Sequence, residues 1–287
     1  MDFVLQSTPL LYSGVFFFGL LIGSFLNVVI LRLPARLEHE WRCQCTELLE
    51  IENGDVEAPA SLVASRSRCP HCGHQLRSWE NIPILSYLLL RGHCSSCREP
   101  ISLRYPLVET LTAILFLISI WHFGPTLAGL SALVLTAFLI AMTGIDLDHQ
   151  LLPDNLTLPL MWGGILASFW SLHADLASSV IGAIAGYLVL WTVYQVFRLL
   201  TGKEGMGYGD FKLMAGLGAW MGWQLLPLVI LLSSVVGAVV GIILMATGKL
   251  DREKPMPFGP FIAAAGWIAM IWGQEIVQLY SNPSAFG

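Results

Sequence analysis

Long apolar runs dominate this chain and restrict its fold more than any other feature. Runs of roughly the 17 to 25 residues that a bilayer's hydrocarbon core requires recur along the sequence. They occur at 11–31, 105–122, 126–145, 155–171, 176–199, 225–247 and 258–280, with a shorter one at 211–222. With 55% hydrophobic and 12% charged residues, the composition excludes a soluble globular protein. We therefore expect an all-α polytopic membrane protein whose first run, lacking a basic leader and a cleavage site, is a retained span.

Residues 211–248 can be interpreted as one over-long helix, or as a short helix, a tight turn near 222–224 and a full span. Basic residues decide between these, because Lys and Arg collect in short cytoplasmic loops. All 15 Lys and Arg residues lie within 32–104, 198–212 and 249–254. These three regions lie on the same side of the membrane only if the chain has eight membrane segments. We expect about eight transmembrane segments, with both termini on the non-cytoplasmic side. No basic block resembles a nucleic-acid patch, so no nucleic-acid partner is expected.

One polar region, 32–104, is long enough to fold outside the bilayer, between the first and second spans. Its acidic first half is expected to be loosely ordered, and its second half carries Cys69-x2-Cys72 and Cys94-x2-Cys97, separated by 21 residues. This spacing is typical of two knuckles that surround a zinc ion with four thiolates. Two disulfides are the alternative, which a reducing cytoplasm disfavours. We predict a small cytoplasmic domain with a closed, structural zinc site.

A further Cys-x-Cys pair, Cys43 and Cys45, lies in the acidic half of the same region. Such a pair can join a metal site. It can equally consist of spare thiols in a flexible segment, and the sequence leaves both interpretations open.

Two aspartates at helix boundaries are the candidate catalytic residues. Asp146 ends one span and Asp210 opens another, 64 positions later and on the same predicted face. Burying an ionised carboxylate in hydrocarbon costs at least about 2.5 kcal/mol, so we expect the two to pair. Paired carboxylates share one proton, one acting as base and the other as acid. Such a dyad can activate water against a peptide carbonyl and protonate the departing amine.

Three glycines, Gly205, Gly207 and Gly209, precede Asp210. A helix cap does not require such a run, whereas close approach of another backbone, such as an extended substrate strand, does. We therefore predict that Gly207 and Gly209 contact substrate.

The remaining membrane-proximal acids have simpler interpretations. Asp154 follows a proline and precedes an apolar run, which favours a helix N-cap. Asp148 and His149 are compatible with a solvated loop, and Glu109, one turn after Arg104, is compatible with a structural ion pair.

At these motifs the sequence resembles the bacterial type IV prepilin peptidases, also called prepilin leader peptidases and N-methyltransferases. The segment "GSFLNVVILRLP" at 23–34 is similar to the family's first-span signature, and the cysteine pairs with the residues between them are similar to its cytoplasmic domain. The segments "DLDHQLLPDNLTLP" at 146–159 and "GYGDFKL" at 207–213 look like its two aspartate motifs.

The resemblance implies that Asp146 and Asp210 are the catalytic pair of an aspartic endopeptidase in the bacterial inner membrane. It implies cleavage of the leader peptide of type IV prepilins and pilin-like secretion proteins at the cytoplasmic face, after a glycine. It also implies N-methylation of the new N-terminal residue with S-adenosylmethionine, to which Gly92 is linked by its similarity to a family position. Both termini would then be periplasmic.

The expected organisation is a first transmembrane helix at 1–31, a zinc domain linked to methyl transfer at 32–104, and a membrane-embedded peptidase domain at 105–287. No Gly-x-Gly-x-x-Gly turn offers the usual adenosyl-cofactor cradle, so the donor pocket is expected between 69–106 and the membrane helices. Two alternatives stay open: a peptidase alone, with the zinc domain as substrate scaffold, and an ion-coupled transporter, in which buried acids are also common.

Overall fold

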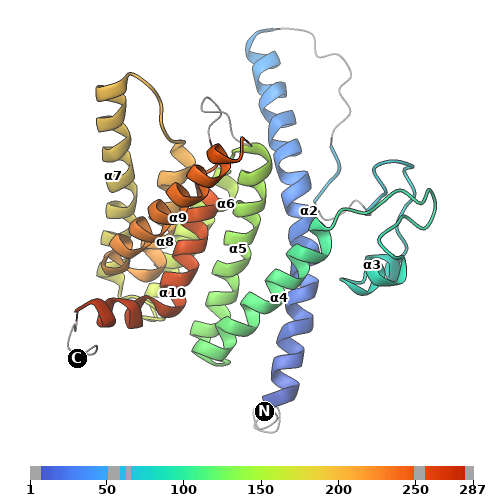
Figure 1. Ribbon diagram of the computed structural model, residues 1–287, viewed down its shortest axis with the longest axis horizontal. Coiled ribbons are helices and arrows are strands. Elements are labelled where there is room, and N and C mark those ends of the chain that lie inside the picture. Colours follow the sequence, from blue (N-terminus) through green and yellow to red (C-terminus); the bar gives the residue numbers. More distant parts are fainter. Residues whose placement is uncertain (1–7, 51–58, 63–65, 249–255, 282–287) are drawn as a thin grey trace. The chain divides into compact units, whose positions relative to one another are not determined.

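The computed structural model describes residues 8–50, 59–62, 66–248 and 256–281, and the regular elements of this part of the chain are helices (Figure 1). The elements are α2 (Thr8–Leu48), η1 (Ser78–Asn81), α3 (Leu85–Leu89), α4 (Arg104–Phe123), α5 (Leu127–His149), α6 (Asp154–Ser168), α7 (Leu176–Thr201), α8 (Tyr208–Met221), η2 (Trp223–Leu225), α9 (Leu226–Ala246) and α10 (Gly259–Ser281). The chain forms two compact units, Met1–Trp121 and His122–Gly287. The domain boundaries predicted at 31 and 105 concern function and stay a prediction.

Among the described residues, six helical segments are long and apolar enough to cross a membrane: α2, α4, α5, α7, α10 and the segment Trp223–Ala246 that contains α9. The other two predicted spans form helices of 15 and 14 residues, α6 and α8. At a rise of 1.5 Å per residue they reach roughly 21 to 23 Å, less than the roughly 30 Å hydrocarbon core. The structure thus supports a polytopic membrane protein with six full-length helices, and it does not confirm eight.

The shortness of α8 has a physical reason. Every residue from Asp210 to Met221 is buried except Lys212, and α8 packs against α6, α7, α9 and α10. A helix that is apolar on all sides belongs in the interior. Because neighbouring helices rather than lipid surround α8, the thickness of the bilayer does not set its length.

Glycines allow α7 and α8 to pack at close range. A Cβ added at Gly182 would collide with the Gly218 carbonyl, and one added at Gly218 would collide with the Gly182 carbonyl. Ser179 Oγ donates a hydrogen bond of 2.6 Å to Ala219 O across the same contact. Small residues and hydroxyl donors commonly join membrane helices in this way.

The tight turn predicted near 222–224 is confirmed. The α8 helix ends at Met221, Gly222 takes a positive φ of 79°, and η2 leads into α9. Residues 211–248 are therefore two helices and not one.

The prediction for the start of the polar region was wrong in one respect. The first helix does not end near residue 31 but continues to Leu48, so the start of the acidic half expected to be loosely ordered is helical. Exposed ion pairs one turn apart, Arg36 with Glu40 and Arg42 with Glu38, lie along this extension and suit a solvated helix. Residues 51–58 and the basic cluster predicted at 249–254 lie outside the described residues.

Within the first unit α2 and α4 cross at two small residues of α2 (Figure 1). A Cβ at Gly19 would come within 2.6 Å of the Ala113 Cα, and one at Gly23 within 2.7 Å of the Glu109 Cα. The amide of Asn27 donates to the carbonyl of Tyr105 at 3.2 Å. The segment that carries the four cysteines therefore connects two helices that pack against each other.

Candidate functional site

The four predicted cysteines form one cluster. The Sγ atoms of Cys69, Cys72, Cys94 and Cys97 all lie within 4.8 Å of one another, and all four thiols are free. The disulfide alternative is therefore not what the structure contains. Among the described residues this is the one group of three or more potential ligands close enough to hold a metal ion.

The two knuckles repeat the same backbone hydrogen bonds. Cys69 N donates to His74 O and Gly73 N to Cys69 O, both at 2.9 Å. In the second knuckle Cys94 N donates to Glu99 O at 2.8 Å and Arg98 N to Cys94 O at 3.1 Å. Gly73 and Arg98 occupy equivalent positions with positive φ. Two equivalent turns face each other, as four tetrahedral ligands require.

The backbone of the second knuckle favours a thiolate at Cys94. Backbone N–H groups of Cys97 and Ser96 point at the sulfur of Cys94 and lower the pKa of its thiol to about 6. Thiolate is the form that binds metal, and four such soft ligands suit zinc. The residues therefore fit a closed metal site that leaves no position for a reactive water.

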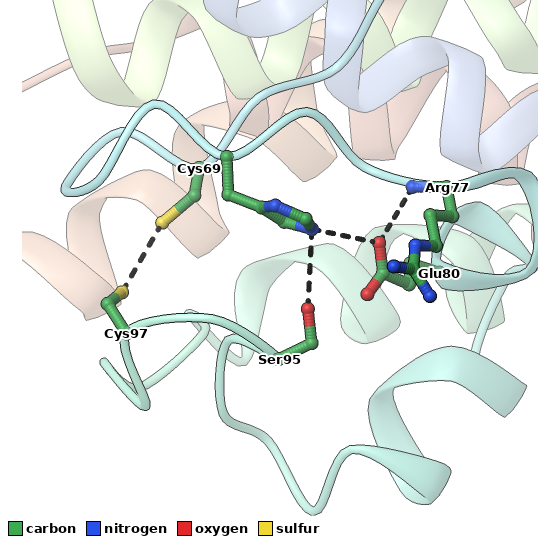
Figure 2. A network of polar contacts seen from close by, with 6 residues as sticks. Cys69, Arg77, Glu80, Ser95 and Cys97 are labelled. Carbon is green, nitrogen blue, oxygen red and sulfur yellow. Dashed lines mark hydrogen bonds and ion pairs between the residues drawn. The ribbon is translucent and has the colours of Figure 1, made fainter.

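A buried carboxylate, Glu80, joins the two knuckles (Figure 2). It accepts a hydrogen bond of 2.7 Å from Arg77 N and lies 3.3 Å from the Nε2 of His74, in the first knuckle. The same His74 nitrogen lies 3.4 Å from the hydroxyl of Ser95, in the second. Hydrogen bonds from Ser95 and Arg77 hold the pKa of Glu80 below its usual 4.5. Glu80 thereby fixes the separation of the cysteine pairs, a role the sequence analysis missed.

The Cys-x-Cys pair does not join this cluster. Cys43 and Cys45 lie on the part of α2 that extends beyond residue 31, where Cys43 Sγ is 3.6 Å from His39 Nε2. These thiols are on a helix and not in the flexible segment that the sequence suggested.

Gly92 is required by the turn that precedes the second knuckle. It has a positive φ of 72°, and an added Cβ would lie 2.8 Å from the Tyr87 hydroxyl. Its carbonyl accepts a hydrogen bond of 2.7 Å from Ile101 N. Gly92 is not among the residues lining the cleft described next, so its predicted link to a cofactor stays a prediction.

The first unit contains a cleft of about 670 Å³ between α2 and residues 62 and 66–83. Its α2 wall includes Ser24, Phe25 and Val28, and three arginines, Arg32, Arg66 and Arg77, line it as well. Pockets for small ligands commonly measure about 300–1,000 Å³. Apolar and guanidinium groups together suit a ligand with an aromatic portion and a carboxylate.

Asp146 and Asp210 are brought together in the second unit. Asp146 lies in the last turn of α5 and Asp210 in the first turn of α8. Their exposed fractions are 5% and 7%, and the two charges are close enough to interact. Two buried carboxylates in mutual range are the arrangement that proton sharing requires.

The three glycines before Asp210 differ in their surroundings. A Cβ at Gly205 would meet the Phe197 ring at 2.7 Å, and one at Gly209 would meet the Leu152 Cβ at 2.6 Å. Internal packing therefore explains both. Gly207 has open space apart from Asp210 Oδ2 at 3.9 Å, which makes it the glycine that another backbone can approach.

Asp154 is not an N-cap as expected. Pro153 occupies that position, and Asp154 is the first helical residue of α6. Its carboxylate pairs with Lys212 Nζ of α8 at 2.6 Å and is 55% exposed. Asp148 and His149 are exposed as expected, but they lie in the last turn of α5 and not in a loop.

Glu109 has a backbone partner that the sequence analysis did not anticipate. Its Oε2 accepts a hydrogen bond of 2.8 Å from Ile84 N, and Ser24 is a further hydrogen-bond partner. Ile84 is the N-cap residue of α3, and backbone N–H groups at a helix start have no acceptor within the helix.

A glycine that the sequence analysis missed touches the aspartate site. Gly259 N, at the start of α10, donates a buried hydrogen bond of 3.0 Å to Asp146 Oδ2. The available signal was a glycine followed by Pro260 at the opening of an apolar run, a pattern typical of a helix start.

Comparison with known proteins agrees with this architecture. Residues 17–123 match the model of the bacterial peptidase A24 N-terminal domain, and residues 133–242 match that of the type IV leader peptidase family. No solved structure gives a significant match.

Several curated bacterial proteins are similar over nearly their whole length, all named prepilin leader peptidase/N-methyltransferase. The Stutzerimonas stutzeri protein is 54% identical, covering 91% of both chains. The Aeromonas hydrophila protein is 55% identical over 94% of both, and the Xanthomonas campestris protein 50% identical over 98% of both. This chain belongs to the type IV leader peptidase family.

Proposed function

We propose that this chain cleaves the leader peptide of type IV prepilins and pilin-like secretion proteins at the cytoplasmic face of the inner membrane, and then N-methylates the new N-terminal residue. The names of its relatives support both activities. The observation that carries the peptidase assignment is the proximity of the buried Asp146 and Asp210, from helices far apart in sequence.

The two carboxylates act as a dyad that holds one proton. The ionised member removes a proton from water as the water oxygen attacks the scissile carbonyl. The protonated member then donates its proton to the departing amine nitrogen as the C–N bond breaks, so the dyad again holds a single proton. Gly207, the open glycine of the motif, lets the extended substrate backbone reach Asp210.

Mass spectrometry of a prepilin substrate tests this assignment. Asp146→Asn and Asp210→Asn keep side-chain shape and remove the dyad, so each lowers leader cleavage by at least about 10³-fold, the scale for loss of an acid–base group with its partner. The matched control is Asp154→Asn, which changes an exposed aspartate on the adjacent α6 and keeps cleavage. Cleavage at near wild-type rate in either dyad variant would refute the assignment.

For the second activity, the cleft of the first unit is the proposed site for S-adenosylmethionine, which supplies the methyl group. Its volume and its arginines support this, because a guanidinium pairs with the donor's carboxylate and Phe25 offers a face for the adenine. Part of its lining, from Leu76 to Pro83, falls within the region 69–106 expected to border the donor pocket, and the rest comes from α2 and from Leu62, Arg66 and Ser67.

Arg66→Gln removes one guanidinium from the cleft and should weaken binding of S-adenosylmethionine about tenfold, roughly one charged hydrogen bond. Leader cleavage should be unchanged. Arg42→Gln, an exposed α2 arginine that does not line the cleft, is the control. Equal donor affinity in all three proteins, measured by titration calorimetry, would place the donor elsewhere. A cleaved product without an added methyl group would support the peptidase-only alternative.

The cysteine cluster is proposed to hold a structural Zn²⁺, and Gly92 to shape the knuckle beside it. The proposed topology counts α6 and α8 as short membrane segments, which makes eight and puts the described basic residues on the cytoplasmic side. A cysteine introduced at Lys203 should then react with impermeant maleimide only in inverted vesicles. Labelling from the periplasmic side would overturn the eight-segment topology.

A further inference from the structure

The start of α10 reaches the aspartate site through its backbone. Gly259 N donates a hydrogen bond of 3.0 Å to Asp146 Oδ2, across 113 residues of sequence and in a buried setting. The first amides of a helix have no partner within the helix. Gly259 is the first residue of the 23-residue α10, so Asp146 supplies the acceptor that this amide lacks.

The contact is also sterically close. A Cβ added at Gly259 would lie 2.6 Å from Asp146 Oδ2, 3.1 Å from its Cγ and 3.2 Å from Leu152 Cδ1. Cβ contacts under 3.0 Å, such as the one with Asp146 Oδ2, essentially never occur, so any larger residue at 259 must displace the carboxylate or the helix. Leu152 also packs against Gly209, one residue before Asp210. The side chain of Leu152 therefore lies between the starts of α8 and α10.

We propose that Gly259 is a positioning residue for peptide cleavage, whose amide fixes Asp146 Oδ2 and so leaves Oδ1 to exchange a proton with water and Asp210. This inference rests on the proposed aspartate dyad. The N-terminal end of a helix stabilises negative charge, and a charged hydrogen bond restricts the rotation of the carboxylate. Gly259 itself touches neither proton nor substrate in this assignment. Its contribution is the orientation of the group that does.

Substitution of Gly259 by Ala tests orientation against packing. The matched control is Gly266→Ala, two turns later on the same helix, where the added Cβ would meet the terminal methyls of Leu217 at 2.5 and 2.6 Å instead of a carboxylate. We expect Gly259→Ala to lower kcat for prepilin cleavage about 100-fold, the scale for a displacement of about 1 Å at a reacting group. KM should stay within twofold, because substrate contacts are unchanged.

Two results would overturn the proposal. One is a kcat of Gly259→Ala within threefold of wild type. The other is that Gly259→Ala and Gly266→Ala change kcat and KM by the same factors. Methylation of an already cleaved pilin should persist in Gly259→Ala, since the first unit is unaltered. Its loss would indicate general misfolding, and the hydrogen bond is then tested on the otherwise intact chain as follows. If Asp146→Asn itself retained cleavage, the dyad and not Gly259 would be the part refuted.

A measurement on the intact chain covers the case in which Gly259→Ala does not fold. With ¹⁵N-labelled glycine in detergent micelles, the Gly259 amide proton should resonate downfield, as expected for a hydrogen bond to a carboxylate. Asp146→Asn should move that resonance upfield, whereas Asp154→Asn, the control on α6, should leave it in place. A Gly259 resonance insensitive to Asp146→Asn would refute the hydrogen bond.

Discussion

His173, in the loop between α6 and α7, provides a pH-dependent test of the second unit. Its Nε2 lies 2.8 Å from Ser131 Oγ, and its ring contacts Phe123 at 5.0 Å and Trp220 at 6.0 Å between centroids. Burial among these groups lowers the pKa of His173 from 6.5 to about 4. The imidazole is therefore neutral in the folded protein at pH values where the unfolded chain is protonated.

The sign and size of the effect follow from linkage. Above pH 6.5 the lowered pKa of His173 does not change the free energy of unfolding. As the pH is lowered from about 6.5 to 4, only the unfolded state binds a proton, so the free energy of unfolding decreases. With these two pKa values, the free energy of unfolding should drop by about 2 kcal/mol between pH 8 and pH 5. Asp175 does not interfere, since a hydrogen bond from Ser178 keeps its pKa below 3.8.

The assay is unfolding in a fixed detergent at pH 8 and pH 5, comparing wild type with His173→Gln. Glutamine keeps a polar amide near Ser131 but cannot titrate, so the pH-dependent part attributable to His173 should vanish. His149→Gln, at an exposed histidine of the same unit, should retain the wild-type slope. Identical slopes in wild type and His173→Gln would refute the claim that burial keeps this imidazole neutral.

Three further outcomes are expected. Cys94→Ser should abolish bound zinc, measured by elemental analysis, because three ligands no longer close the tetrahedral site; one zinc per chain in this variant would contradict the assignment. Glu80→Gln should speed removal of the metal by a chelator about tenfold, as loss of an outer-shell partner commonly does, whereas an unchanged rate would show that the knuckles hold their separation without it. Gly218→Val should prevent accumulation of folded protein, because its side chain would collide with the Gly182 carbonyl; wild-type yield and unfolding temperature would contradict the tight α7–α8 packing.

The fold was predictable wherever local pattern determines it. Apolar run lengths gave the positions of the helices, and Gly222 marked the break between α8 and α9. The count of full spans was not predictable, because the short α8 owes its length to the helices around it. The extension of α2 to Leu48 was missed as well, since acidic composition indicates exposure but does not distinguish a solvated helix from a loop.

At the candidate site, the sequence alone identified the reactive groups. The spacing of the four cysteines indicates the sulfur ligands, and the positions of the two aspartates at span boundaries indicate the carboxylate pair. Only the tertiary structure decided which backbone and side-chain groups surround them. The amide of Gly259 reaches Asp146, Glu80 bridges two knuckles, and Lys212 pairs with Asp154. Such partners depend on how helices and turns that are far apart in the sequence pack together. Local preferences for helix, turn or charge do not predict these contacts.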